Sequence, residues 1–270
     1  VPAGIVAPPG SSFSVADCCY VTMDLRVVVL QLTAVWMYTD GQTVFPDSYY
    51  CKFTKEHTLC RHKRPAAACD LVYERGVPRE DQKIIMKMMN KFRSQVTLGK
   101  VKKGNRPLPQ AADMMELQWD DELAAIAQRH VEQCHFDHEC IDCRLVDRFL
   151  VGQNLYADFQ FEMKSDWPVT IKAWTESEVD IFDLKHIDKY EFVEEVGHLT
   201  QQLWAETTSV GCGFISFRFR KYWIERFYAC NYGPSGNFLE YPIYLKGKPT
   251  SLCPKRTMES WRYPGLCMKL

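Results

Sequence analysis

The chain has 270 residues, enough to bury a sizeable core, and it is most simply one domain with extended ends. Its 33 basic and 34 acidic residues give a formal net charge of −1, which argues against a nucleic-acid binder because neutralising phosphates requires a basic excess. Two short basic runs, RHKRP and RFRKYW, are interpreted as solvated surface.

The amino end predicts a secretory signal peptide over residues 23–41. Residues 1–22 are rich in Pro, Gly and Ser and have no periodicity, so we interpret them as a segment upstream of the native start. From Met23 the chain has one basic residue, an apolar run of about a dozen positions and a small polar exit near Gly41, which is the order of parts in a signal peptide. The run is too short for a membrane span, which needs about 20 apolar residues.

The alternative is that residues 23–37 form a buried helix or strand of the mature protein. The signal-peptide interpretation removes Cys18 and Cys19 and leaves ten of the 12 cysteines, an even number able to form up to five bridges. The cysteines lack metal-finger spacing, because CIDC at 140–143 is a single C-x-x-C without matching histidines. Scattered cysteines in a chain of this size fit a disulfide framework and an oxidising, extracellular compartment.

Residues 42–79 are predicted to be a loop-like extension that disulfides hold down. Cys51, Cys60 and Cys69 lie in it at intervals of nine, and the segment has little apolar periodicity. The pattern changes at Glu80, where a helical stripe begins and a domain over residues 80–244 is predicted. The apolar positions of this stripe are Ile84, Ile85, Met88, Met89, Phe92 and Val96.

Three further helices and a hairpin are expected along this domain. Residues 117–134 repeat the helical pattern through Trp119, Leu123, Ile126, Ala127 and Val131. Pro168, a favoured first-turn residue, begins another helix, whose side carries Ile171, Trp174, Glu178 and Phe182. The third helix has His198 near its start, and the runs SVGCGFISF and YWIERFYACNY form a hairpin joined by RFRK. Helices followed by a short antiparallel sheet predict an α/β layered domain, with residues 245–270 as a polar tail.

Two segments resemble the signatures of the CAP superfamily, which comprises cysteine-rich secretory proteins, antigen 5 proteins and plant pathogenesis-related proteins. They are GHLTQQLW (197–204) and FYACNYGPSGNF (227–238), and VGQNLYADF (151–159) and MNKFRS (89–94) match two weaker segments. WDDELAAIAQRHVEQC and CRLVDRFLVGQN are similar to arthropod antigen 5 proteins of venom and saliva, tick- and scorpion-like ones especially. The signature positions here are Gly197, Thr200, Gln201, Trp204, Asn231, Tyr232, Gly236 and Asn237.

The resemblance implies a three-layer α-β-α sandwich with a central cleft, in which two histidines and one or two glutamates can hold a divalent ion. His198 matches the histidine of the first signature segment, and His138 matches the other histidine. Gln153 stands where many members have the first glutamate. Without the resemblance, the local sequence leaves three roles open for His198: a packed core imidazole, a metal ligand or a catalytic base.

The second glutamate is expected at Glu178. The family places it three residues after a helix tryptophan, but that position is Ser177 here. Glu178 follows Trp174 at i+4 and shares its helix face, whereas Glu176 at i+2 does not. The Gln153 replacement removes one anionic ligand, so the resemblance implies no required cofactor and at most a weakly bound Zn²⁺ or other divalent cation.

A secreted, non-enzymatic binding protein is the expected function. The sequence has no H-E-x-x-H and no G-x-S-x-G, since GPSGN around Ser235 has the wrong spacing. The alternative is a weak metal-dependent hydrolase that uses His138, Glu178 and His198. The expected form is a monomer without membrane span or nucleic-acid partner.

Two kinds of partner are left open. One is a small apolar ligand, a sterol, fatty acid or eicosanoid, with Phe159, Phe161 and Trp167 as candidate lining residues or else plain core. The other is an extracellular protein target, although the nearest string to an integrin-binding RGD is RGV at 75–77. The tail has too few cysteines for the channel-blocking module of the cysteine-rich secretory group.

The resemblance also implies three disulfides. They are Cys212–Cys230 in the hairpin, and Cys51–Cys143 and Cys69–Cys134 between the extension and the core. Cys60 and Cys140 are left unassigned, and so are Cys253 and Cys267, which are free to bridge each other.

Overall fold

The computed structural model describes residues 44–63, 65–220 and 222–270. The signal peptide predicted over residues 23–41 and the upstream segment 1–22 lie outside the described residues. The described residues belong to one compact unit.

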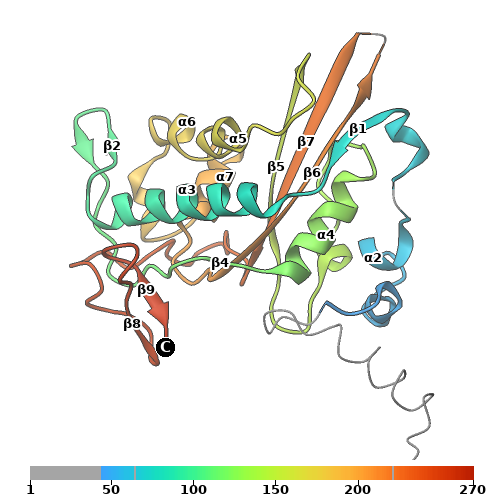
Figure 1. Ribbon diagram of the computed structural model, residues 1–270. Coiled ribbons are helices and arrows are strands. Elements are labelled where there is room, and N and C mark those ends of the chain that lie inside the picture. The colour runs from blue at the N-terminus through green and yellow to red at the C-terminus, as the bar shows by residue number, and fades with distance from the viewer. Residues whose placement is uncertain (1–43, 64, 221) are drawn as a thin grey trace, which may run out of the picture. The chain divides into compact units, whose positions relative to one another are not determined.

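A twisted antiparallel sheet lies at the centre of this unit (Figure 1). Its strand order is β1-β6-β7-β5, and β4 (Gln118–Trp119) adds a short parallel pairing to β6. The predicted hairpin is present as β6 (Ser209–Phe219) and β7 (Trp223–Gly233), flanked by β1 (Val72–Arg75) and β5 (Gly152–Gln160).

Alternation along β6 sends side chains to two different cores. Val210, Cys212 and Phe214 pack with α3 (Arg79–Thr97) and α5 (Trp167–Ala173) on one face. Ile215 and Phe217 pack on the other face, which α4 (Asp121–Val131) covers. Successive strand residues point to opposite faces, so both faces of the sheet are buried. The predicted three-layer α-β-α sandwich is confirmed.

Two glycines let α4 approach the sheet. A Cβ on Gly211 would lie 2.2 Å from the Ala124 backbone nitrogen, and one on Gly213 would lie 2.4 Å from the Gln128 nitrogen. The glycines of SVGCG therefore fix the spacing between helix and sheet on this side. Asp120 caps the same helix by accepting a hydrogen bond from the Leu123 amide at 3.0 Å.

The helix predicted to run from Pro168 past Glu178 is broken. It ends with α5, and a separate turn, α6 (Glu176–Val179), follows. Thr175 between them has φ −128° and ψ −86°, and its hydroxyl donates to the Ile171 carbonyl at 2.6 Å. Such a side-chain bond to the backbone competes with helical hydrogen bonding, and here the chain turns.

The extension of residues 44–79 is more regular than predicted. It contains η1 (Asp47–Lys52), α2 (Thr58–Arg61) and η2 (Ala67–Cys69) before β1. Tyr50 and Leu59 from it are buried with Leu123 and Ile126 of α4, so an apolar cluster as well as the Cys69–Cys134 disulfide holds it to the domain.

Two of the implied disulfides are formed and one is not. The structure joins Cys212 to Cys230 and Cys69 to Cys134, as the resemblance implied. The prediction of Cys51–Cys143 is wrong. Cys51 is bonded to Cys60, because η1 packs on α2 and brings the two Cα atoms within 5.0 Å. Cys143 is bonded to Cys140 within the turn that contains both.

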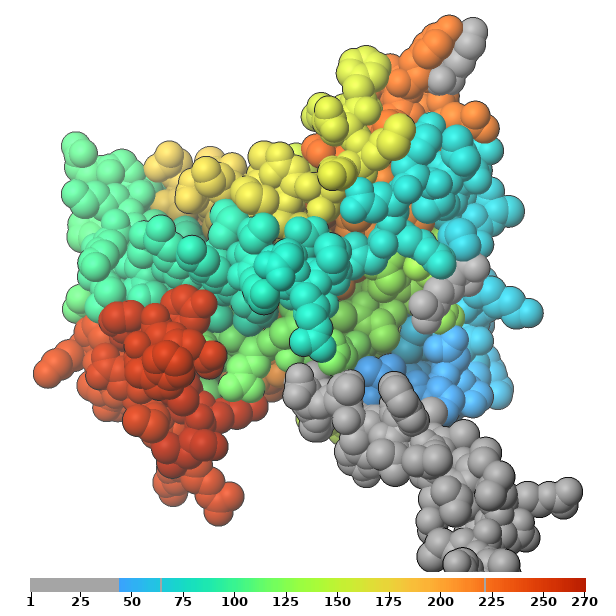
Figure 2. All heavy atoms as spheres, viewed as in Figure 1, coloured from blue at the N-terminus to red at the C-terminus, as the bar shows by residue number. Residues whose placement is uncertain are grey.

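The carboxyl-terminal residues form a small hairpin instead of a loose tail. β8 (Thr257–Glu259) pairs with β9 (Cys267–Lys269), and Cys253 is bonded to Cys267. Figure 2 shows this segment beside α3, where the Ser94 hydroxyl donates to the Pro264 carbonyl at 2.6 Å. The remaining elements are β2 (Lys102–Lys103), β3 (Arg106–Pro107), η3 (Ile141–Arg144), η4 (Leu184–Ile187), η5 (Glu194–Val196) and α7 (Gly197–Leu203). Within the described residues, the structure has no helix both long and apolar enough to span a membrane.

Candidate functional site

A pocket of about 590 Å³ opens where β5, α7 and the segment after α4 meet. His138, Gln153 and His198 all line it, so the structure brings three of the four predicted cleft residues to one wall. The other lining residues are Phe136, Asp137, Asn154, Leu155, Phe192, Glu194, Gly197 and Asn237.

The fourth residue, Glu178, lies behind His198. Its Oε1 accepts a hydrogen bond from His198 Nδ1 at 2.7 Å, and its Oε2 accepts from the Leu199 amide at 2.8 Å. Glu178 is buried whereas Glu176 is exposed. Since a carboxylate oxygen only accepts, His198 carries its proton on Nδ1 and turns Nε2 towards other partners. The indole of Trp174 stacks on the imidazole with 6.3 Å between ring centres, which further fixes its plane.

His138 is held in the same way by an amide. Its Nδ1 donates to Gln153 Oε1 at 3.0 Å, and Gln153 Nε2 in turn donates to Asn231 Oδ1 at 3.1 Å. Partial burial lowers the pKa of His138, and the nearby charge of Arg144 acts in the same direction. Both ring orientations are thus determined before any ligand arrives.

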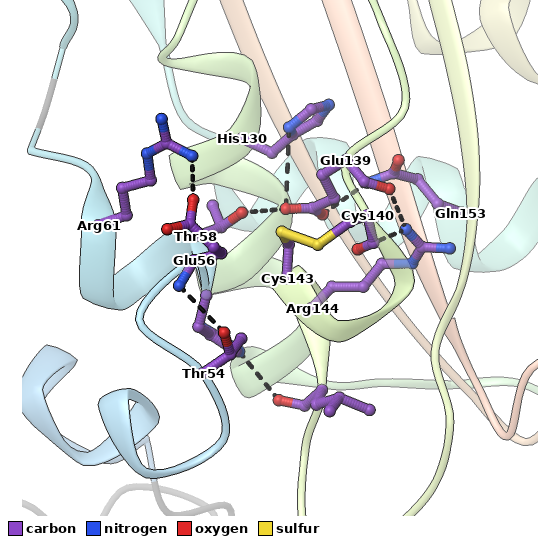
Figure 3. The surroundings of a disulfide bond; sticks show 12 residues. Thr54, Glu56, Thr58, Arg61, His130, Glu139, Cys140, Cys143, Arg144 and Gln153 are labelled. Atoms are coloured by element: carbon purple, nitrogen blue, oxygen red, sulfur yellow. Dashed lines mark hydrogen bonds and ion pairs between the residues drawn. A yellow bond between two sulfur atoms is a disulfide. The ribbon is translucent and has the colours of Figure 1, made fainter.

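A buried carboxylate that the sequence did not indicate supports Gln153 from outside the lining of this pocket. Glu139, only 6% exposed, accepts from Gln153 Nε2 at 2.8 Å and also from the Thr58 hydroxyl (Figure 3). Burial raises the pKa of Glu139 to about 7. Its one sequence signal was its place beside His138, because it lies in a turn without periodicity.

Most signature positions support the pocket from behind. Gln201 accepts from the Gly236 amide at 3.0 Å, and Asn237 donates to the Gly197 carbonyl at 2.9 Å. These bonds tie α7 to the chain after β7. Asn154, also unpredicted, donates to the His198 carbonyl at 3.1 Å and fixes α7 to β5. Thr200, Trp204, Asn231 and Tyr232 are buried.

The arrangement fits a protein-held metal ion poorly. Both oxygens of Glu178 are engaged by His198 and Leu199, and the oxygen of Gln153 is engaged by His138. Two imidazole Nε2 atoms are left as donors, whereas a catalytic zinc site has three protein ligands. Across the described part of the chain, no group of three or more His, Cys, Asp and Glu residues is arranged to hold a metal ion.

The three aromatic residues predicted to line an apolar ligand site do not lie together. Trp167 is buried in the core between the sheet and α3. Phe159 and Phe161 are 46% and 71% exposed at the far end of β5, where Phe161 stacks on Trp223 with 4.9 Å between ring centres. The alternative of plain core therefore holds for Trp167.

Comparisons with known proteins agree with this fold. The chain is 39% identical over 250 residues to the CRISP/Allergen/PR-1 protein of Trittame loki, which covers 89% of this chain and 59% of that protein. It is 38% identical over 195 residues to venom allergen 3 of Solenopsis invicta, covering 70% of this chain and 82% of that protein. The chain thus spans about three fifths of the length of the first relative.

A solved structure and a family model extend the match. The crystal structure of NaASP2 with Zn²⁺ is 27% identical, with a TM-score of 0.57 over 71% of this chain and 97% of that one. The model of the cysteine-rich secretory protein family, CAP, matches residues 86–232, which include β5, β6, most of β7 and both cleft histidines. The chain therefore belongs to the CAP, or cysteine-rich secretory protein, family.

Proposed function

We propose that this chain is a secreted, venom- or saliva-type binding protein that holds a small amphipathic ligand in the His138–His198 pocket. The observation that carries the proposal is the pocket itself. Its volume of about 590 Å³ lies in the range of small-molecule sites. Apolar side chains from Phe136, Leu155 and Phe192 line it together with a few polar groups, which is the composition that such ligands require.

The orientation of the two imidazoles supports recognition of a polar head group. Each Nδ1 is engaged by Glu178 or Gln153, so each Nε2 faces away from its partner and can accept a hydrogen bond from a hydroxyl. Phe136 and Phe192 are 52% and 66% exposed, and covering them with an aliphatic chain or ring system removes apolar surface from water. A sterol or a fatty-acid derivative has both parts.

The hydrolase alternative receives less support from the same groups. None of the eleven lining residues is Ser, Thr or Cys, so a covalent route through the pocket lacks a hydroxyl or thiol nucleophile. Glu178 does not line the pocket, and both its oxygens already accept hydrogen bonds, so a water in the pocket lacks Glu178 as its base.

Extraction of the purified full chain with organic solvent, followed by mass spectrometry, tests the proposal. We expect a co-purifying lipid at near-stoichiometric level, and binding of a fluorescent fatty-acid probe that weakens about tenfold in Phe192→Ser because one apolar wall is lost. Phe161→Ser is the matched control, because Phe161 is equally exposed but lies on the hairpin end outside the pocket.

Loss of binding in Phe161→Ser alone would move the ligand to the hairpin end. Absence of any lipid and of probe binding would leave the extracellular protein target as the better hypothesis. Turnover of peptide or ester substrates that disappears in His198→Ala would reverse the ranking of binding over hydrolysis.

A further inference from the structure

A second pocket adjoins the first at Asp137 and His138 and lies next to the disulfide between Cys140 and Cys143. Its volume is about 520 Å³, and both cysteines line it together with Thr58 of α2, His130 of α4 and His62. Figure 3 shows the disulfide with Thr58 and His130. Of the ten cysteines that the structure describes, Cys140 is the one that is exposed. A thiol arriving from solvent can therefore reach the Cys140 sulfur.

Hydrogen bonds that do not involve the disulfide stabilise the turn that contains Cys140 and Cys143. Arg144 is buried, and its guanidinium donates to the carbonyls of Glu139 at 2.6 Å, Cys140 at 3.2 Å and Val151 at 2.8 Å. The Cys143 amide also donates to the Cys140 carbonyl at 3.0 Å. These bonds keep the two cysteines side by side when the sulfur–sulfur bond opens, so the bond can form again.

The short separation of the two cysteines also sets this bond apart. Residues 140 and 143 are three positions apart, whereas the other four bridges join positions 9, 14, 18 and 65 apart. Opening a bridge releases chain entropy that grows with the length of the closed loop, so opening this bridge frees the least of the chain. This bridge therefore contributes the least of the five to the stability of the fold, which leaves room for a chemical role.

We propose that Cys140 and Cys143 form a redox-active pair that oxidises the dithiol of a peptide or protein by thiol–disulfide exchange. The substrate thiolate attacks Cys140 Sγ and forms a mixed disulfide, and the electron pair of the broken bond goes to Cys143 Sγ, which takes up a proton. The second substrate thiolate then attacks the substrate sulfur of the mixed disulfide and expels Cys140 as a thiolate, which is protonated.

The net step transfers two electrons. The substrate dithiol loses two electrons and two protons and becomes a disulfide. Cys140 and Cys143 take up two electrons and two protons and become thiols. A low-molecular-weight disulfide, such as oxidised glutathione, restores the protein bond and is itself reduced to two thiols. The disulfide pocket adjoins the His138–His198 pocket and shares Asp137 and His138 with it, but the exchange uses only Cys140 and Cys143 and does not depend on the function proposed for the first pocket.

Alkylation of the native full chain in graded glutathione buffers is the first test. We expect Cys140 and Cys143 to be modified by iodoacetamide at a reduced-glutathione level at least tenfold below the level that exposes Cys51 and Cys60. The Cys51–Cys60 bridge is the matched control, because it is the next shortest and neither of its cysteines is exposed. Labelling of both pairs at the same level, or of Cys51 and Cys60 first, overturns the proposal.

Turnover is the second test, with a reduced peptide dithiol as substrate and oxidised glutathione as terminal oxidant. The wild-type chain should oxidise many equivalents of peptide, and the Cys140→Ser/Cys143→Ser variant should fall to the uncatalysed rate. The Cys51→Ser/Cys60→Ser variant should keep the wild-type rate. Equal rates for the wild type and the 140/143 variant contradict the proposal.

A single variant covers the case in which the double variant does not fold. Cys143→Ser leaves Cys140 as a free thiol, which should form a mixed disulfide with glutathione that mass spectrometry of the folded protein detects. A Cys140 that stays unmodified in the folded Cys143→Ser chain, at oxidised-glutathione levels that modify a free peptide thiol, also contradicts it.

Discussion

At the level of single residues, the Glu178 carboxylate has two structural roles at the site that its sequence position does not reveal. It accepts one hydrogen bond from the His198 ring and one from the Leu199 amide in the first turn of α7. The same side chain therefore sets the tautomer of the imidazole and satisfies a backbone donor that a helix start leaves free. The sequence analysis chose Glu178 over Glu176 because it expected Trp174 and Glu178 on one helix face, but the chain turns at Thr175 between them. The buried place of Glu178 and its role as an orienting group depend on contacts that the sequence does not contain.

Replacing Glu178 with Ala should lower the free energy of unfolding by about 2–3 kcal/mol. The reason is that the His198 ring and the Leu199 amide would both lose their buried carboxylate acceptor. Urea unfolding at neutral pH measures the change. Glu176→Ala is the control, since Glu176 is exposed on the same short helix and should change stability by less than about 0.5 kcal/mol. Equal losses in both variants would argue against the orienting role.

Burial of His130 makes stability depend on pH. Burial lowers the pKa of His130 to about 4, while its Nε2 lies 2.9 Å from the Asp137 carbonyl. In the unfolded chain the pKa is about 6.5, so between these values the unfolded state binds more protons than the folded state. Stability is therefore lost as the pH falls below about 6.5. The raised pKa of Glu139 acts in the opposite sense, because its carboxyl binds a proton more readily in the folded state below about pH 7.

His130→Gln should remove the histidine part of this dependence. Between pH 7.5 and pH 5 we expect the wild type to lose about 2 kcal/mol more stability than the variant, from 1.36 kcal/mol for each pKa unit crossed. Guanidinium unfolding curves at both pH values give the difference. A variant that loses as much stability as the wild type would show that His130 is protonated in the folded state as readily as in the unfolded one.

At the level of elements, close contact between α4 and β6 determines the depth of the sandwich on one side. Gly211 and Gly213 lie against the backbone of α4, where a Cβ has no room. The alternation of SVGCGFISF predicted a strand, but a glycine in a strand is ambiguous until the neighbouring helix is in place. The broken helix at Thr175 is a similar case, since the apolar stripe continued through the break while the backbone turned.

Gly211→Ala should destabilise the protein by about 3 kcal/mol, because α4 must move away from the sheet to admit the methyl group. Thermal unfolding monitored by circular dichroism measures it. Gly197→Ala is the control, since Gly197 has a helical φ of −60° and an added Cβ would lie 3.9 Å from Phe192. That variant should be neutral or more stable by up to about 1 kcal/mol. A Gly211→Ala chain as stable as the wild type would contradict the packing described here.

At the level of the whole described unit, one disulfide and an apolar cluster attach the amino-terminal segment to the sandwich. Cys69–Cys134 spans 65 positions and joins η2 to the chain just after α4. Tyr50 and Leu59 bury their side chains against α4, and Tyr50 donates to Glu122 at 2.8 Å. The segment is therefore part of the fold, although it carries none of the signature positions.

Removing Cys69–Cys134 with a Cys69→Ser/Cys134→Ser variant should cost about 4 kcal/mol, because a long loop in the unfolded state is released. Limited proteolysis should then cut first within residues 44–79. The Cys253→Ser/Cys267→Ser variant is the control and should be cut first after residue 245, since its bridge closes a loop of 14 positions in the terminal hairpin. Identical cleavage patterns in the two variants would be inconsistent with separate attachment of the two segments.

The amino-acid sequence by itself determined the family, the layered fold and the two cleft histidines. These follow from local patterns: apolar stripes at helical spacing, alternation in the hairpin, and signature segments that keep their order along the chain. The resemblance to the CAP family implied His138, Gln153 and His198 as cleft residues, and all three line one pocket.

The tertiary structure alone decided which atoms of those residues are free and which cysteines are bonded. Glu139, Asn154 and Glu178 act through side-chain contacts between segments far apart in the chain, and a turn residue such as Glu139 leaves no periodic signal. The pairing of Cys51 with Cys60 depended on how η1 packs on α2. Bond formation requires Cα atoms within about 7 Å, and spacing along a sequence does not fix that distance.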